Sequence, residues 1–183
     1  ELESLKIDNN YLKELDVSKN TELSTLQADE NNLSEIDVSN NIGLGYLTLI
    51  NNSLTKIDVR NNLKLSNLRL DRNEISDINV KRNINLKRLS LSYNNISSID
   101  VSKNKVLEIL NLNFNKLSKI NVYLNTNLNS LRVSNNKLDD LDITNNPDLT
   151  TLDISNTGLA PAIDVSKNFG LVEFDLTSNP DLE

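Results

Sequence analysis

The chain has 183 residues, a formal net charge of −7 and an aromatic content of only 4%. It contains no Cys and no His, which excludes disulfides and thiol chemistry and removes the commonest general base and metal ligand. No apolar run reaches the length of about 18 residues that a transmembrane helix needs, so we expect no membrane insertion. Because Cys and His are absent, we also expect no catalytic residue, metal site or cofactor.

The sequence is built from a repeat with a period of 21. Counting from Leu107, an aliphatic residue stands at repeat positions 1, 4, 6, 11, 14 and 16, and Asn stands at positions 9 and 19. Such a period predicts a solenoid. We therefore predict one domain over residues 1–183, with eight full units and a partial ninth, which forms part of a longer chain. The units begin at Leu2, Leu23, Leu44, Leu65, Leu86, Leu107, Leu128, Leu149 and, after one extra residue near Pro161, Leu171.

Each unit contains the same spacing twice, as in residues 107–115 and 117–125. Aliphatic residues two apart are typical of a short, half-buried strand, and Asn favours the bend that follows. Stacking of each strand on its copy in the next unit predicts a mainly β solenoid with two parallel β faces. We expect a weakly curved, right-handed coil with little or no helix, roughly 40 Å long at about 4.8 Å per turn.

Asn occurs 33 times, and 15 of these residues fall into two columns. The side-chain amide both donates to and accepts from backbone groups, so we predict a structural Asn ladder at each bend. The first column contains Asn10, Asn31, Asn52, Asn73, Asn94, Asn115 and Asn136, and the second contains Asn20, Asn41, Asn62, Asn83, Asn104, Asn125, Asn146 and Asn168.

This pattern resembles the leucine-rich repeat family, and more narrowly the short, doubly nested repeats of internalin J-like and Bacteroidetes surface proteins. The similarity covers the whole chain and includes the Ile-Asp-Val-Ser sequence at residues 36–39, 99–102 and 163–166. In internalin J-like repeats the sixth position often holds Cys, whereas this chain has residues such as Leu49 and Leu112 there. The resemblance implies a binding module that presents the face of its first strands.

The candidate binding residues lie in the middle units. Repeat positions 3, 5, 7 and 8 are predicted to face solvent, and most units hold small polar residues there. Large residues at these positions, together with Arg132 in the seventh unit, define the predicted partner-binding set: Tyr46, Ile50, Arg69, Arg72, Arg88, Tyr93, Ile109, Phe114 and Arg132.

Within this set, Arg72, Tyr93 and Phe114 share repeat position 8 in consecutive units. Tyr and Arg are enriched at interface hot spots, and an exposed Phe reduces solubility unless a partner covers it. The alternative is ordinary variation on a tolerant surface, with Phe114 packed against its neighbours. The unit at 107–127 is unusual throughout, because Ile109, Phe114, Tyr123 and Leu124 are apolar where other units are mostly polar.

The charge is arranged in blocks, which bear on the choice of partner. Residues 1–43 have 10 acidic and 3 basic residues, residues 44–127 have 6 and 13, and residues 128–183 have 10 and 3. The net charges are therefore −7, +7 and −7. The basic middle block favours an acidic or polar protein surface with an apolar spot, whereas the acidic ends oppose nucleic-acid binding.

A column of acidic side chains follows the second strand and allows two interpretations. It contains Asp16, Asp37, Asp58, Asn79, Asp100, Asn121, Asp142 and Asp164. Divalent cations prefer several oxygen ligands, so a row of carboxylates could bind them. The favoured interpretation is that each side chain accepts backbone hydrogen bonds, because Asn interrupts the column.

Taken together, these features predict a non-enzymatic protein-interaction module on a bacterial surface or in a secreted protein, with a role in adhesion or partner recognition. Two alternatives stay open. The chain could be a structural spacer rod, which would not need the large residues at position 8, or it could bind glycans through Tyr46, Tyr93 and Asn side chains.

Overall fold

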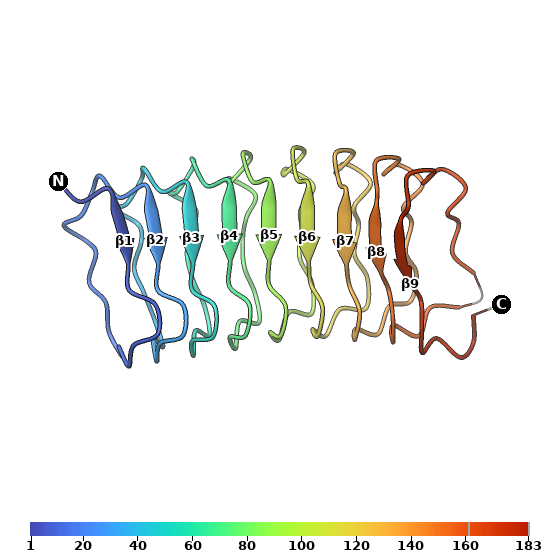
Figure 1. Ribbon diagram of the computed structural model, residues 1–183, viewed down its shortest axis with the longest axis horizontal. Helices are drawn as coiled ribbons and strands as arrows, with labels where there is room; N and C mark the ends of the chain where they lie inside the picture. Colours follow the sequence, from blue (N-terminus) through green and yellow to red (C-terminus); the bar gives the residue numbers. More distant parts are fainter. Residues whose placement is uncertain (161, 183) are drawn as a thin grey trace.

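The computed structural model of the protein describes residues 1–160 and 162–182, so Pro161 and Glu183 of the predicted domain lie outside the described residues. Within this part, nine parallel strands hydrogen-bond in chain order into one sheet. Figure 1 shows them side by side in a nearly straight row, with the chain returning behind the sheet. The strands are β1 (Ser4–Lys6), β2 (Thr25–Gln27), β3 (Tyr46–Thr48), β4 (Asn67–Arg69), β5 (Arg88–Ser90), β6 (Ile109–Asn111), β7 (Ser130–Arg132), β8 (Thr151–Asp153) and β9 (Glu173–Asp175).

The strand register follows the repeat, as predicted. Leu89 in β5 pairs with Leu110 in β6, and Arg88 pairs with Ile109, so each residue pairs with its counterpart in the next unit. The extra residue near Pro161 is absorbed outside the sheet, since Leu152 in β8 still pairs with Phe174 in β9. Equivalent repeat positions therefore form columns that run across the strands.

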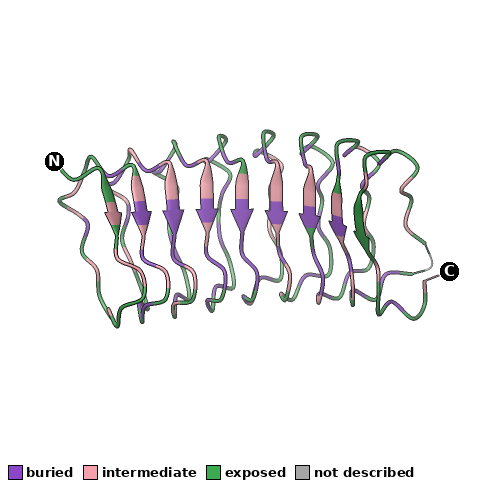
Figure 2. Ribbon diagram, in the orientation of Figure 1, coloured by how far each residue is buried: buried purple, intermediate pink, exposed green. Residues whose placement is uncertain are grey.

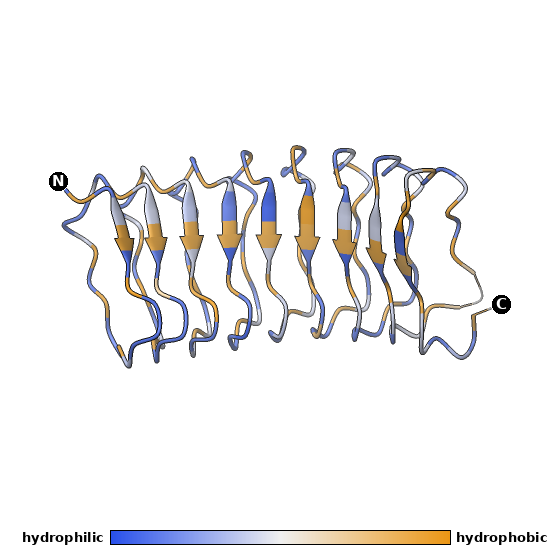
Figure 3. Cartoon of the chain, in the orientation of Figure 1, coloured by the Kyte–Doolittle hydropathy of each residue, from blue (hydrophilic) through white to orange (hydrophobic). Residues whose placement is uncertain are grey.

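The core consists of aliphatic residues between the sheet and the returning chain. Leu110 and Leu112 are fully buried, as are Leu117 and Val122 on the second half of the same turn. Figure 3 shows the central residue of each strand as hydrophobic, and Figure 2 shows it as buried in β2–β8. In β9 all three residues are exposed, because no further turn covers them among the described residues.

Both predicted Asn ladders are present. In the first, the Asn94 amide donates to the carbonyls of Leu70 and Leu91 at 2.9 and 3.1 Å and accepts from Ile75 N at 2.9 Å. In the second, Asn83 Nδ2 donates at 2.9 Å to the carbonyls of both Val59 and Asn62 in the preceding turn. Each ladder thus satisfies backbone groups of the bend and ties one turn to its neighbour.

The second face is extended but is not a second sheet in the described residues. Neighbouring turns exchange single backbone hydrogen bonds there, such as Lys116 N to Ile96 O at 2.9 Å. The Asp side chains fold back on their own turn, as when Asp100 Oδ1 accepts from Ser102 N at 2.9 Å. This bend stops the backbone from continuing as a ladder, so the two-faced solenoid has a regular sheet on its first face only.

The structure has no helix in residues 1–160 and 162–182. Within the same residues, therefore, no helix could cross a membrane.

Candidate binding surface

Three side chains from consecutive turns form a stack at repeat position 8. The Tyr93 and Phe114 rings are parallel within 10°, with centroids 4.1 Å apart. The guanidinium carbon of Arg72 lies 4.5 Å from the centroid of the Tyr93 ring, so Tyr93 stands between Arg72 and Phe114. Both aromatic residues remain about 40% exposed, at 41% and 39%. We call these three residues the position-8 stack.

The backbone of the position-8 stack adopts a conformation that bulky residues rarely take. Arg72, Tyr93 and Phe114 have φ values of 56°, 55° and 55°. Four other turns place Asn at this position, which tolerates positive φ far better than an aromatic residue does. Repeat position 8 is thus the left-handed residue of the bend after each strand. This constraint was not predicted from the sequence, although the Asn residues at 9, 51, 135 and 156 indicate it.

Strain of this kind has an energetic cost. A left-handed conformation costs an L-residue roughly 1–2 kcal/mol, whereas an offset aromatic pair contributes about 0.5–1.5 kcal/mol and a cation–π contact about 0.5–1 kcal/mol at an exposed site. Over the three residues the strain amounts to roughly 3–6 kcal/mol, against roughly 1–2.5 kcal/mol from one aromatic pair and one cation–π contact, so the position-8 stack gives the fold no net stability. Arg72, Tyr93 and Phe114 are thus strained residues in three adjacent turns, and Glu30, with a φ of 55°, is a further bulky residue at this position.

The other candidates do not all converge on this stack. Arg88 and Ile109 are direct neighbours at the start of β5 and β6, at the opposite end of the strands from the position-8 stack. Tyr46 begins β3 and is separated from Arg88 by the β4 residue Asn67. The structure therefore places Tyr46 far from Tyr93, which removes support for a shared glycan site.

The remaining candidates, Ile50, Arg69 and Arg132, lie outside the position-8 stack. Ile50 and Arg69 are half-buried on the front of the third and fourth turns. Arg132 is exposed, and its guanidinium lies 3.5 Å from the Glu173 carboxylate, two turns further on. Such an exposed ion pair adds little stability.

The expectation that positions 5 and 7 face solvent is wrong in the middle units. Thr48, Asp71, Ser90 and Ser92 are buried there. The cause is hydrogen bonding between neighbouring turns: Thr48 Oγ1 donates to Asp29 Oδ1 at 2.6 Å, and Ser92 N donates to Asp71 Oδ1 at 3.0 Å. These polar groups hydrogen-bond to one another across the sheet and are shielded from solvent.

The acidic column on the second face performs the structural role that the sequence favoured. Hydrogen bonds from the Ser18 hydroxyl and backbone N–H lower the pKa of Asp16, and the same contacts from Ser39 lower the pKa of Asp37. The Arg60 side chain and backbone lower the pKa of Asp58 to about 2. Asn79 accepts the equivalent bond from Lys81 N at 3.1 Å, so the turn does not require a charge.

A groove of about 840 Å³ on this face was not anticipated. Its floor consists of buried and partly buried aliphatic residues at repeat position 14, and carboxylates at positions 13 and 15 form much of its walls. No group of three or more metal-binding side chains occurs in the part of the chain that the structure describes. The floor residues are Leu15, Ile36, Ile57 and Ile78.

Comparison with known proteins agrees with this geometry. A family model described as "Leucine Rich repeat" matches residues 82–103. The functional domain of internalin J from Listeria monocytogenes is 28% identical over 100% of this chain, with a TM-score of 0.75. The chain is therefore similar to bacterial leucine-rich repeat proteins over its whole length. The internalin J domain is described as including a cysteine ladder, which this leucine-rich repeat chain, without Cys, does not share.

Two further structures share the leucine-rich repeat fold. A leucine-rich repeat protein of Leptospira interrogans is 25% identical over 99% of this chain, with a TM-score of 0.92. The ectodomain of a receptor kinase from Arabidopsis thaliana, solved with CASPARIAN STRIP INTEGRITY FACTOR 2, is 26% identical over 96% of this chain, with a TM-score of 0.89. The chain spans 50% of the internalin J and Leptospira structures and 24% of the Arabidopsis one. A search of curated protein sequences gives no match.

Proposed function

We propose that the chain is a non-enzymatic protein-interaction module of a bacterial surface or secreted protein, which recognises its partner through the position-8 stack. The observation that carries this proposal is the positive φ of Arg72, Tyr93 and Phe114. Three bulky residues occupy a backbone position that favours Asn or Gly, although they stabilise the fold little. A binding role accounts for their presence.

The chemistry of the stack fits a protein partner. Tyr and Arg are the residues that dominate interface energetics, and the repeats fix them before binding, so little conformational entropy is lost on association. Lys116, two residues after Phe114 in the sequence, is exposed and adds to the positive charge of Arg72. The partner should present an acidic or polar surface with an apolar spot that covers the rings.

The similarity to internalin J supports a surface location and a role in adhesion or partner recognition. A structural spacer rod is the main alternative, but a spacer would gain nothing from strained aromatic residues. Other domains of a longer parent chain would place the module relative to the cell.

Differential capture tests the proposal. The chain would be immobilised beside a variant with Arg72, Tyr93 and Phe114 all replaced by Asn, and both would be exposed to bacterial and host-cell surface extracts. The proposal expects a protein that the native chain retains and the variant loses. If every retained protein binds both chains equally, the position-8 stack is not the binding site.

A further inference from the structure

The turns that precede β3–β7 form a strongly basic edge, which is the upper edge in Figure 1. These turns are residues 39–43, 60–64, 81–85, 102–106 and 123–127, and we call them the cationic edge. They contain no acidic residue. The turn on one side of them has Glu22 and the turn on the other side has Asp148, so the excess charge is confined to the middle of the rod. The cations are Arg60, Lys64, Lys81, Arg82, Lys103 and Lys105.

Two of these cations are shared with the acidic column on the second face. Arg60 lies 2.7 Å from the Asp58 carboxylate, and Lys81 lies 3.0 Å from that of Asp100. Both ion pairs are exposed and therefore weak. The excess charge of the cationic edge comes mainly from the other four side chains.

The same five turns expose large apolar side chains. Ile42, Leu63 and Ile84 occupy the same repeat position in three consecutive turns and are 63%, 44% and 57% exposed. A row of this kind reduces solubility unless it is covered, so it indicates a contact surface. Val106, Tyr123 and Leu124, at other repeat positions of the next two turns, are also exposed.

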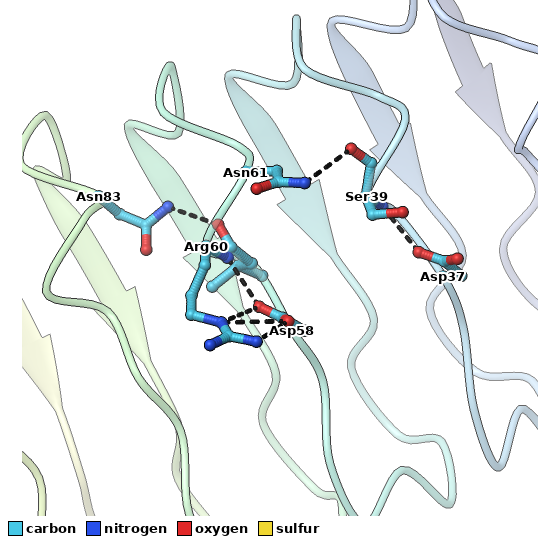
Figure 4. A network of polar contacts seen from close by, with 7 residues as sticks. Asp37, Ser39, Asp58, Arg60, Asn61 and Asn83 are labelled. Carbon is cyan, nitrogen blue, oxygen red and sulfur yellow. Dashed lines mark hydrogen bonds and ion pairs between the residues drawn. The ribbon is translucent and has the colours of Figure 1, made fainter.

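The backbone holds this row rigidly. The buried Asn83 joins its turn to Val59 and Asn62, as described above, and Asn85 Nδ2 donates to Leu63 O at 3.0 Å. Figure 4 shows a further contact between turns, in which Asn61 Nδ2 donates to Ser39 O at 3.4 Å. Neighbouring tips are therefore held about 4.8 Å apart, and the apolar and basic side chains project from a regularly spaced backbone.

The charge of the cationic edge restricts what can cover it. A second copy cannot dock edge to edge, because the cations of one copy would face those of the other. An acidic protein would match the charge but would need a recess for each protruding aliphatic side chain. An anionic bilayer matches both features, because its headgroups attract Lys and Arg and its interface accepts separate aliphatic side chains and Tyr without preformed pits.

We propose that the cationic edge docks peripherally on an anionic lipid surface. Ile42, Leu63 and Ile84 enter the headgroup region, and the flanking cations contact lipid phosphates. The chain lies on the surface and does not cross it. This contact uses the edge of the sheet opposite to the position-8 stack, so it does not depend on the proposed protein partner.

Vesicle sedimentation tests the inference. The purified chain would be mixed with vesicles of phosphatidylcholine alone or of phosphatidylcholine mixed with phosphatidylglycerol, at low and at high salt. We expect at least about tenfold more binding to the anionic vesicles, and loss of binding at high salt as the charges are screened. Equal binding to both kinds of vesicle, or none at low salt, would overturn the proposal.

Two variants separate charge from apolar contact. One carries Arg82→Ser, Lys103→Ser and Lys105→Ser, and the other carries Ile42→Ser, Leu63→Ser and Ile84→Ser. Each should bind anionic vesicles at least about tenfold more weakly while its circular dichroism stays native, because the replaced side chains are exposed. The matched control carries Lys6→Ser, Lys13→Ser and Lys137→Ser, loses the same charge elsewhere, and should bind like the native chain.

The remaining outcomes contradict the lipid assignment. If the apolar variant binds like the native chain, the contact is a charge effect without insertion of aliphatic side chains. If soluble polyglutamate binds the edge but anionic vesicles do not, the occupant is an acidic polypeptide. If the control loses as much binding as the charge variant, the effect belongs to net charge and not to this edge.

Discussion

The rings of Tyr93 and Phe114 lie 4.1 Å apart and parallel within 10°, although both residues have a φ near 55°. Stacking and backbone strain therefore oppose each other at the same two residues. Arg72 repeats the relationship one turn earlier, with its guanidinium over the Tyr93 ring and a φ of 56°. The surface that this creates is rigid, partly apolar and positively charged at one end.

Replacement of all three stacked residues by Asn should not destabilise the fold. Asn tolerates the left-handed region better and relieves part of a strain of roughly 1–2 kcal/mol at each of the three residues, whereas the change loses about 0.5–1.5 kcal/mol of stacking and about 0.5–1 kcal/mol of cation–π attraction. We expect the free energy of unfolding, measured by urea titration, to equal or exceed the native value. A loss of several kcal/mol would show that the stack is a structural element.

Substitution of a buried Asn in the second ladder should lower the free energy of unfolding, although the residue lies on a bend. Asn83→Ala removes the two buried hydrogen bonds that Asn83 Nδ2 donates to Val59 O and Asn62 O. It removes no accepted bond, since Asn83 Oδ1 has no hydrogen-bond partner among the described residues. Val59 O and Asn62 O each keep a backbone donor, so the cost is that of two lost bonds, and we expect a destabilisation of about 2 kcal/mol in urea unfolding. The exposed neighbour Asn61, changed to Ala, should cost less than about 0.5 kcal/mol; equal effects would refute the ladder.

The buried hydroxyl of Thr48 provides a test of the hydrogen bonds between turns. Thr48→Val keeps the shape but removes the donor to Asp29 Oδ1, and should destabilise the fold by about 1–2 kcal/mol. Thr25→Val at the partly exposed start of β2 is the matched control and should be close to neutral. If thermal melts show the same shift for both variants, the front of the sheet is held by packing alone.

The acidic column should make the fold sensitive to acid. Hydrogen bonds lower the pKa of the folded Asp side chains, so the unfolded state binds protons first as the pH falls. Their stabilising contribution is present above the unfolded pKa of about 4 and is lost as the pH falls through the folded values, about 2 for Asp58. The melting temperature of the native chain should therefore drop between pH 5 and pH 2, roughly the window set by these pKa values.

A variant tests the cause of this drop. Asn accepts the same turn bond at Asn79 and Asn121, so Asn in place of the charged residues should keep the fold and reduce the pH dependence. A control that removes four carboxylates outside the column should retain the native dependence. The variant changes Asp16, Asp37, Asp142 and Asp164 to Asn, and the control changes Glu14, Glu22, Glu35 and Glu74 to Gln.

Much of the fold can be predicted from the sequence, because every repeat has the same spacing of aliphatic residues and Asn. The spacing of Leu110, Leu112 and Asn115 predicts a strand and a bend, and the constant repeat length predicts the register. Burial of Thr48 and Asp71 could not be predicted in this way, since it depends on hydrogen bonds between different turns. The second face was predicted as a strand by its aliphatic spacing, but the Asp turns after it prevent a regular sheet.

The candidate site was predictable in part for a related reason. The shared repeat position of Tyr93 and Phe114 indicates that they are neighbours, which the stacked geometry confirms. Their strained backbone is a property of the bend, and only comparison with the Asn residues in other units reveals it. The exposed row at Ile42, Leu63 and Ile84 was overlooked, because it lies on the turn before the strand and not on the strand face.

The affinity of a captured partner for the variant with Asn at positions 72, 93 and 114 tests the central claim most directly. Asn135→Ala, at the same repeat position in the next turn, is the control. We expect the dissociation constant to rise at least about tenfold, or about 1.4 kcal/mol, for the variant and to stay unchanged for the control. An unchanged affinity of the folded variant would contradict the assignment of the position-8 stack as the binding site.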